Sequence, residues 1–326
     1  MIGGRRGASA HAGGGEAVVV IDDMRRRDLR RRLNKYWMLY IFLAVPVVLL
    51  ALFHYVPLYG IQIAFKDYRI GVGIWGSQWN NFQHFKDFFG TPYFGRIMRN
   101  TLLISFQRLL FGFPAPIILA LLLNEVGSIH FKRVVQTISY LPHFMSWVVL
   151  AAILTEVLSP QRGIVAYFYT LLGKQPPNLL MEAALFQPLL ILTGIWQGVG
   201  WGTVVYLAAI SSIDLELYES ASIDGAGRLQ RAVYITIPAL YPMITILFIL
   251  QTGGILNAGF DQIFNLYNPI VYEVSDIIDT YVYRVGLIDR RYDFSTAVGL
   301  FKNVFGVLLL LLTNAVVKRF SENGIW

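Results

Sequence analysis

Six apolar stretches, each about 20 residues long, constrain this chain more than any other feature of its sequence. They are Tyr36–Val56, Asn100–Leu123, Val135–Val157, Phe186–Ile210, Pro242–Phe264 and Phe294–Val317. A helix of about 20 apolar residues is long enough to cross the hydrocarbon core of a bilayer. Backbone amides in lipid must find hydrogen-bond partners within their own segment, which favours helices. The stretches therefore predict an all-α integral membrane protein with one six-helix transmembrane domain over residues 36–317.

The composition agrees with a membrane protein. Only 14% of the residues are charged and 56% are hydrophobic, whereas a soluble domain carries about 25% charged residues. There is no cysteine, which excludes disulfides, thiolate metal sites and cysteine nucleophiles. A tail of 35 residues precedes the first stretch and no small-residue cleavage site follows it, so we do not expect a cleavable signal peptide.

Lysines and arginines indicate the orientation, because they are enriched on the cytoplasmic side of a membrane. The clusters Arg25–Arg27 and Arg30–Arg32 stand just before the first apolar stretch. We therefore expect cytoplasmic termini: a basic, partly disordered tail over residues 1–35 and a short tail over residues 318–326. The polar loop 211–240 falls on the same side. The net charge of +7 needs no nucleic acid, because contact with anionic membrane lipid accounts for it.

Signatures of catalysis are missing from the sequence. It contains no phosphate-binding loop, no G-x-S-x-G elbow and no H-E-x-x-H pair. The histidines have no metal-ligand spacing; they are His11, His54, His84, His130 and His143. We expect a chain that is not an enzyme and that binds no metal or cofactor itself.

The loop Tyr218–Pro238 is polar and punctuated by glycine, in contrast to the apolar runs on both sides. Asp214 is suited to cap a short helix at its N-terminus. Gly225 lies in a segment where glycine can take positive φ at little cost, which predicts a turn. Pro238 fits the first turn of the fifth span. These signals predict two short helices that another protein could contact, although an amphipathic connector lying on lipid is the alternative.

The loop resembles the signature of binding-protein-dependent ABC importer permeases, which reads Glu-Ala-Ala, three residues, Gly, nine residues, Ile-x-Leu-Pro. Here it stands as Glu219-Ser220-Ala221, Gly225 and Ile235-Thr236-Ile237-Pro238, with Ser220 in place of Ala and Ile237 in place of Leu. From Tyr36 onward the chain is similar to the maltose-type carbohydrate-importer permeases, and most similar to the polysaccharide-permease subgroup named after LplB. The segments that carry this similarity are Phe111–Pro116, Ser139–His143, Gly198–Gly202, Asn257–Phe260 and Gly324–Trp326.

The resemblance implies a permease subunit in the bacterial cytoplasmic (inner) membrane that imports an oligo- or polysaccharide, including an acidic one such as alginate. It also implies partners: a second permease, expected to be a different chain, two ATPase subunits that use ATP and Mg, and an external or periplasmic solute-binding protein. The first helix of the loop would be the coupling helix that docks on an ATPase. Its contact and turn residues would be Leu215, Tyr218, Glu219, Ser220, Ala221, Asp224 and Gly225.

In this family the sugar site lies at mid-membrane depth on the helices that flank the coupling loop. Aromatic faces and amides bind sugars, so the candidates are Gln197, Trp201, Gln251 and Asn257. Packing within the bundle is the alternative role for the tryptophan, and bridging between helices is the alternative for the amides. Arg108 and Lys302 are further candidates, because charges within a span are costly and mark functional sites. Either could steer a uronate, and pairing with a carboxylate or with the partner permease is the alternative.

Two other classes of function stay open at this point. An ion-coupled secondary sugar carrier would need no ATPase, but the single polar inner loop and the lack of a clear acidic proton relay in the spans disfavour it. A membrane scaffold or sensor without transport is disfavoured by the aromatic and amide residues at membrane depth.

Overall fold

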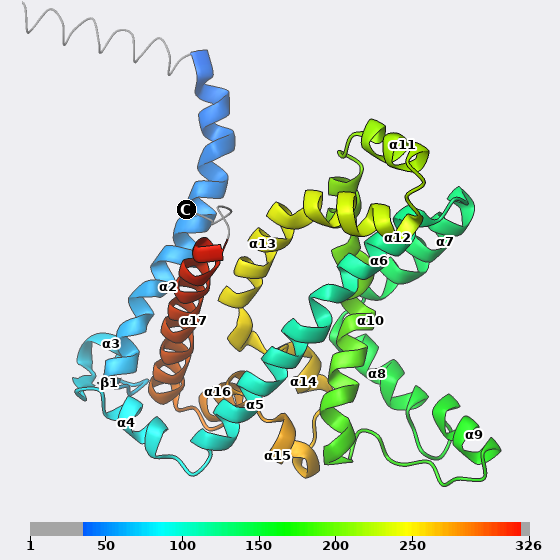
Figure 1. Ribbon diagram of the computed structural model, residues 1–326. Coiled ribbons are helices and arrows are strands. Elements are labelled where there is room, and N and C mark those ends of the chain that lie inside the picture. Colours follow the sequence, from blue (N-terminus) through cyan, green and yellow to red (C-terminus); the bar gives the residue numbers. More distant parts are fainter. Residues whose placement is uncertain (1–34, 321–326) are drawn as a thin grey trace, which may run out of the picture. The chain divides into compact units, whose positions relative to one another are not determined.

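The computed structural model describes residues 35–320. The predicted tails, apart from their residues next to the membrane domain, and the segment Gly324–Trp326 lie outside the described residues. The described part is mainly helical and contains one small antiparallel sheet, in which β1 (Lys66–Asp67) pairs with β2 (Gln78–Trp79) (Figure 1). The chain divides after Ile61 into two compact units, each described by itself.

The first unit holds most of the helix Lys35–Phe65. Within this helix, the π-helical turn η1 (Ala51–Tyr55) is followed by α2 (Val56–Leu58) and the 3-10 helix η2 (Tyr59–Phe65). Its length and apolar composition suit a membrane span, in agreement with the first predicted stretch.

The second unit contains the rest of the helices. They are α3 (Gly73–Gly76), α4 (Gln83–Gly90), α5 (Phe94–Gln107), η3 (Arg108–Gly112), α6 (Pro114–Glu125), α7 (Ile129–Tyr140), η4 (Leu141–Phe144), α8 (Trp147–Val157), α9 (Ile164–Leu171), α10 (Ala183–Ile210), α11 (Leu215–Ile223), α12 (Arg228–Arg231), η5 (Ala232–Thr236), α13 (Ile237–Gly253), η6 (Ile255–Asn257), α14 (Phe260–Leu266), η7 (Pro269–Val271), α15 (Tyr272–Ser275), α16 (Ile278–Tyr283), η8 (Arg284–Ile288) and α17 (Tyr292–Phe320). Figure 1 shows α11 and the α6–α7 connection at one end of this unit, with α8, α9, α15 and α16 toward the other.

Five helices of the described part are long and apolar enough to cross a membrane: Lys35–Phe65, Phe94–Glu125, Ala183–Ile210, Arg228–Gly253 and Tyr292–Arg319. A sixth span is present if the pair Ile129–Phe144 and Trp147–Val157, which meet at 108°, counts as one. The break follows Pro142 in η4, and the Ser146 hydroxyl then caps α8 by accepting a bond from the Val149 amide at 3.4 Å. The prediction of an all-α membrane protein is confirmed, and the count of six requires the bent pair.

The fifth predicted stretch, Pro242–Phe264, has the wrong boundaries. The continuous helix begins at Arg228 and ends at Gly253, and Pro238 lies in the first turn of its α13 part, as predicted, after the preceding turns α12 and η5. The chain then breaks through η6, where Ala258 and Gly259 take left-handed conformations with φ of 42° and 83°. The apolar run continues through this break into α14, which is why hydropathy alone did not separate the two helices.

Three π-helical turns are placed directly before prolines. Proline has no amide hydrogen, and its ring clashes with the carbonyl group four residues earlier. In each case that carbonyl belongs to the middle residue of a π turn: η1 precedes Pro57, η3 precedes Pro114 and η5 precedes Pro238. A π turn shifts the bonding to the residue five positions on, so these helices continue past their prolines.

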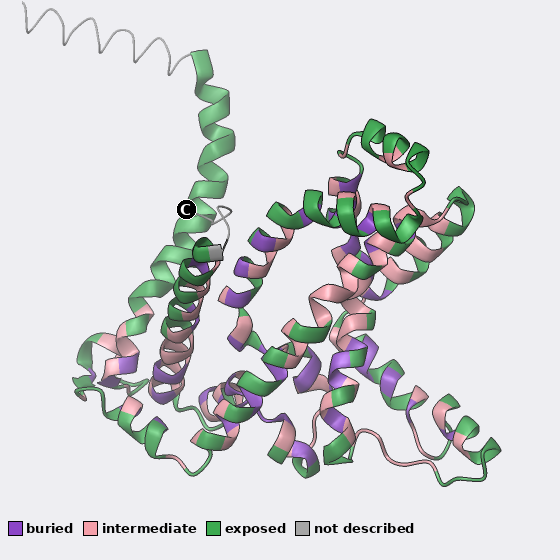
Figure 2. Ribbon diagram, viewed as in Figure 1, coloured by how far each residue is buried: buried purple, intermediate pink, exposed green. Residues whose placement is uncertain are grey.

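Buried apolar side chains form three clusters in the second unit (Figure 2). The largest joins α5, α8, α10 and α14 through residues such as Ile104, Leu154, Phe186 and Ile263. A second cluster packs Phe88 of α4 against α16 and α17, and a third joins α6, α10 and α13 near the end that carries α11. α10 belongs to the first and third clusters and contacts η3, α5, α13 and α14, which border the sites described below.

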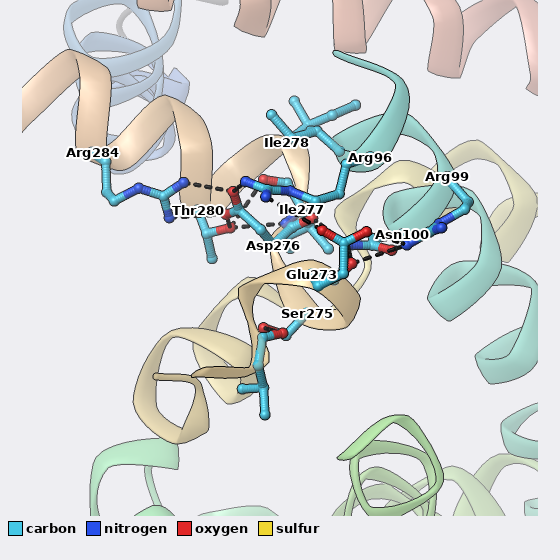
Figure 3. Close-up of polar contacts among 12 residues, drawn as sticks. Arg96, Arg99, Asn100, Glu273, Ser275, Asp276, Ile277, Ile278, Thr280 and Arg284 are labelled. Atoms are coloured by element: carbon cyan, nitrogen blue, oxygen red, sulfur yellow. Dashed lines mark hydrogen bonds and ion pairs between the residues drawn. The ribbon is translucent and has the colours of Figure 1, made fainter. Parts of the chain in front are cut away.

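A buried carboxylate, that of Asp276, organises the segment between α14 and α17 (Figure 3). Arg284 donates two hydrogen bonds to its oxygens at 2.8 and 2.6 Å, and the Thr280 hydroxyl donates a third at 2.8 Å. Arg96 of α5 lies 3.6 Å away on the other side. Burial alone would lower the pKa of Arg284, but its bonds to Asp276 and the charge of that carboxylate outweigh burial and hold the pKa above its ordinary value.

The same segment is fixed to α5 by neutral hydrogen bonds. The Asn100 amide donates to the carbonyl oxygens of Glu273 and Asp276 at 3.0 and 3.2 Å. The backbone amide of Ile278 donates to the Thr101 hydroxyl at 3.0 Å. Because Asn100 and Thr101 are fully buried, these bonds satisfy backbone groups that water does not reach.

We predict that Asp276→Asn destabilises the protein by about 3 kcal/mol, because removing one partner of a buried ion pair leaves the other charge uncompensated. The check is thermal denaturation of the purified protein in detergent, followed by fluorescence-detected size exclusion. Glu273→Gln is the matched control: its side chain is 64% exposed, so its loss should cost under about 1 kcal/mol. Equal midpoints for the two variants would contradict the organising role of Asp276.

Candidate functional site

The predicted local signals of α11 are present in the structure. The Asp214 carboxylate caps the helix by accepting a bond from the Glu216 amide at 3.0 Å. At the other end Gly225 has φ of +81°, and the amide of Ala226 closes the turn by donating to the Ala221 carbonyl at 2.8 Å. A side chain at position 225 would strain this backbone. The predicted first short helix and its glycine turn are therefore confirmed, whereas the second helix, α12, is continuous with the fifth span.

One face of α11 is attached to the helix that follows it. The Tyr218 hydroxyl lies 2.8 Å from the hydroxyl of Thr236 in η5. Arg231 of α12 donates to the Ser222 hydroxyl at 2.7 Å. Among the predicted contact residues, Tyr218 is therefore directed toward the membrane domain, where it supports α11 instead of adding to its exposed face.

α11 is largely exposed (Figure 2), and its exposed side chains include both apolar residues and carboxylates. Leu215 and Ile223 are 73% and 87% exposed, and Glu219 lies between them at a spacing of four residues in each direction. Ser220 and Asp224 are also exposed, and Ala221 is half-buried. Exposed apolar residues around an acidic side chain on a short helix are suited to a protein groove that carries a complementary charge.

Arg108, Gln251 and Asn257, which are far apart in the sequence, meet at one cavity. Its volume is about 300 Å³, and its wall also contains Ser105 and Gly259. Arg108 is the first residue of the π turn η3, while Gln251 and Asn257 border the break after α13. The cavity therefore forms where two spans depart from regular α-helix.

The side chain of Gln262 connects the Arg108 guanidinium to α10 by hydrogen bonds. The guanidinium donates to the Gln262 side-chain oxygen, and the Gln262 amide donates to the Leu190 carbonyl at 2.8 Å and to the Thr193 hydroxyl at 2.7 Å. A methyl group at Gly259 would overlap with the guanidinium, so glycine is required there both for space and for its positive φ. The position of this cation is thus fixed by residues from α10, α14 and the break.

Lys302, the second predicted cation, is already paired. Its ammonium group donates to both oxygens of Asp279 on α16, at 2.6 and 2.7 Å. Burial raises the pKa of the Asp279 carboxyl, while the bond to Lys302 opposes that rise. Lys302 also lines a cavity of about 410 Å³ that it shares with Asn257. Pairing with a carboxylate, the alternative considered from the sequence, is what the structure contains.

Gln197 and Trp201 lie on α10 and do not line the cavity at Arg108. The indole ring of Trp201 stacks on the His143 ring, with centroids 4.9 Å apart and planes at 4°, and Phe144 meets it edge-on at 5.7 Å. Five of the six predicted substrate residues therefore divide into a cavity group, the Lys302 ion pair and the Trp201 stack between α10 and η4, and Gln197 lies on α10 outside these groups.

The structure adds residues that sequence reasoning missed. Gln262 and Thr193 position Arg108. A larger cavity of about 670 Å³ is lined by Trp147, Phe260 and Tyr283 together with Asn257. Gln262 stands next to Asp261 in the mixed segment Phe260–Phe264, so the apolar pattern of the sequence does not single it out. Within residues 35–320 no group of three or more acidic or histidine side chains could hold a metal ion.

Residues 112–322 match the family described as binding-protein-dependent transport system inner membrane components. The chain is 43% identical to protein LplB of Bacillus subtilis strain 168, covering 88% of this chain and 91% of that one. It is 42% identical to the polygalacturonan/rhamnogalacturonan transport system permease protein YteP of the same organism, covering 93% and 94%.

The fold of this chain is also similar to that of solved structures. A chain in the crystal structure of a bacterial ABC transporter involved in the import of the acidic polysaccharide alginate superposes with a TM-score of 0.82 at 40% sequence identity. The match covers 90% of this chain and 99% of that chain. The same values hold for that transporter in complex with an alginate pentasaccharide-bound periplasmic protein.

We predict that Tyr218→Phe loosens α11 without unfolding the protein. Loss of the hydroxyl contact with Thr236 should cost about 1 kcal/mol locally, which corresponds to roughly fivefold faster amide hydrogen exchange in residues 215–225. Glu219→Gln is the control, since this exposed side chain makes no hydrogen bond to the described residues. Unchanged exchange in Tyr218→Phe would show that other contacts hold the helix.

Proposed function

Because the chain belongs to the family of binding-protein-dependent transport system inner membrane components, we propose that it is the sugar-translocating permease of an ATP-driven importer whose cargo is an acidic oligo- or polysaccharide. The observation that carries the proposal is similarity over nearly the whole chain to permeases named for polygalacturonan and alginate. Both glycans are polymers of uronic acids, so their shared feature is a carboxylate on successive sugar rings.

The proposed assembly contains a second permease subunit, two ATPase subunits and a solute-binding protein. This chain supplies half of the translocation path in the inner membrane, with both termini and α11 on the cytoplasmic side. ATP and Mg are bound by the ATPase subunits, and this chain performs no chemistry. An ion-coupled secondary carrier, the alternative considered from the sequence, is not supported by these similarities.

In this proposal α11 is the coupling helix. Leu215 and Ile223 supply exposed apolar contact, Glu219 supplies a charge, and Gly225 shapes the turn that follows. Tyr218 and Ser222 link the helix to η5 and α12, so a movement of the ATPase would reach α13. The exposed apolar side chains, Leu217 among them, support a docking role because they are presented beside exposed polar residues on a short helix.

The sugar path in this proposal follows the cavities around the break after α13. Gln251 and Asn257 offer amides to hydroxyl groups, and the neighbouring cavity offers the aromatic faces of Trp147, Phe260 and Tyr283. Aromatic faces and amides together suit carbohydrate rings, which have apolar faces and polar edges. Trp201 and Gln197 are proposed as a second contact region on α10.

We predict that Glu219→Lys abolishes ATP-driven uptake while the protein still inserts into the membrane. A lysine in place of the carboxylate reverses the charge that would meet the ATPase, and a like-charge contact costs several kcal/mol. The measurement is uptake of labelled oligogalacturonate into proteoliposomes that contain the assembled importer, with the amount of inserted permease determined by immunoblot.

Glu125→Lys is the matched charge reversal. It lies at the end of α6, on the same end of the bundle as α11, and should transport at a rate within twofold of the unmodified importer. Normal uptake by Glu219→Lys would contradict the coupling role, and uptake that depends on an ion gradient instead of ATP would contradict the importer itself.

A further inference from the structure

Arg108 has no carboxylate partner within residues 35–320, in contrast to two other cations that lie near the cavities. Arg284 is paired with Asp276 and Lys302 with Asp279. The Arg108 guanidinium instead donates to the neutral amide oxygen of Gln262, and its Nε atom is buried without a partner. An uncompensated cation within a span is costly, so the arrangement favours binding of an anion.

The space for an anion is present beside this cation. The 300 Å³ cavity extends from Arg108 past Ser105, Gln251 and Asn257. Ser105 is only 3% exposed and its hydroxyl has no hydrogen-bond partner. A buried hydroxyl without a partner costs free energy, and this one is a donor in the wall of the same cavity as the cation.

The surroundings of Arg108 fix its position and do not neutralise it. Gln262 is anchored by Leu190 and Thr193, and Gly259 leaves space that any other residue would fill. A guanidinium whose rotamer is fixed loses less conformational entropy when it binds a ligand. These features are expected of a binding group and are not needed for packing alone.

We infer that Arg108 and Ser105 bind one carboxylate group of the transported glycan, with Gln251 and Asn257 contacting neighbouring hydroxyls of the same sugar. Arginine is suited to this role because its planar donors match the two oxygens of a carboxylate. The inference rests on the proposed function and adds to it: discrimination between acidic and neutral glycans is located at one residue of this chain.

The test is binding of two trisaccharides to the assembled importer in nanodiscs, measured by titration calorimetry. One is trigalacturonate, and the other is the same trisaccharide with its carboxyl groups reduced to alcohols. The unmodified importer should prefer the acid by about tenfold or more, as expected for a hydrogen bond to a charged group. Arg108→Gln should remove that preference by weakening the acid alone, leaving the affinity for the reduced sugar within about twofold.

Three further variants separate binding from structure. Arg108→Lys keeps the charge and should retain part of the preference. Gly259→Ala keeps Arg108 but displaces its guanidinium, so the preference should fall. Arg99→Gln removes a cation from the same helix outside the cavity and should leave the preference unchanged.

Equal weakening of both sugars in Arg108→Gln would overturn the inference, because it would indicate a structural role or a carboxylate supplied by the partner permease. Absence of a preference in the unmodified importer, or its persistence in Arg108→Gln, would also overturn it. Failure of the proposed function looks different: trigalacturonate would bind with the stated preference, yet ATP would drive no uptake into proteoliposomes.

Discussion

In a hydrocarbon environment each backbone amide and carbonyl must be paired inside the protein, and this constraint decides where the present chain can be irregular. Its prolines at positions 57, 114 and 238 each follow a π turn, and the helices continue past them. The break after Gly253 instead uses left-handed residues and a short 3-10 helix. One of those π turns and this break border the same polar cavity. Irregular backbone and polar side chains are therefore concentrated together, where water or a substrate can satisfy them.

The distribution of charge follows a second rule. Asp276 and Asp279 lie on successive parts of one segment, and each neutralises a cation: Arg284 of the same segment and Lys302 of α17. The Lys302 pair fixes this segment against α17, and Arg96, 3.6 Å from Asp276, links it to α5, so that its aromatic residues line the wall beside the cavities. Arg108 is left with a neutral amide. In the proposed function, Arg108 is therefore the cation beside the cavities that would bind an anionic ligand.

Local features of the fold could be predicted from the sequence. Four of the spans and the ends of α11 depend on apolar length, on Asp214 as a cap and on Gly225 in a turn, all of which act over a few residues. The end of the fifth span was predicted too late, because apolar residues continue past Gly253 into α14 and hydropathy does not register the left-handed residues Ala258 and Gly259. Lys302 and Asp279 are 23 residues apart on different helices, and no local sequence pattern predicts such a pair. Tyr218 belongs to the expected motif, but only the position of Thr236 reveals that its hydroxyl is directed inward.

The helix from Arg228 to Gly253 runs without interruption for 26 residues, a length of about 39 Å at 1.5 Å per residue. Its first turns are bonded to α11, and Gln251 near its last turn lines the cavity. This helix therefore connects α11 at one end to the cavity at Arg108 at the other. The only irregular turn along it is η5, next to the Tyr218 contact. If α11 is the coupling helix, as proposed, a displacement of α11 would be transmitted along this single helix to Gln251 at the cavity.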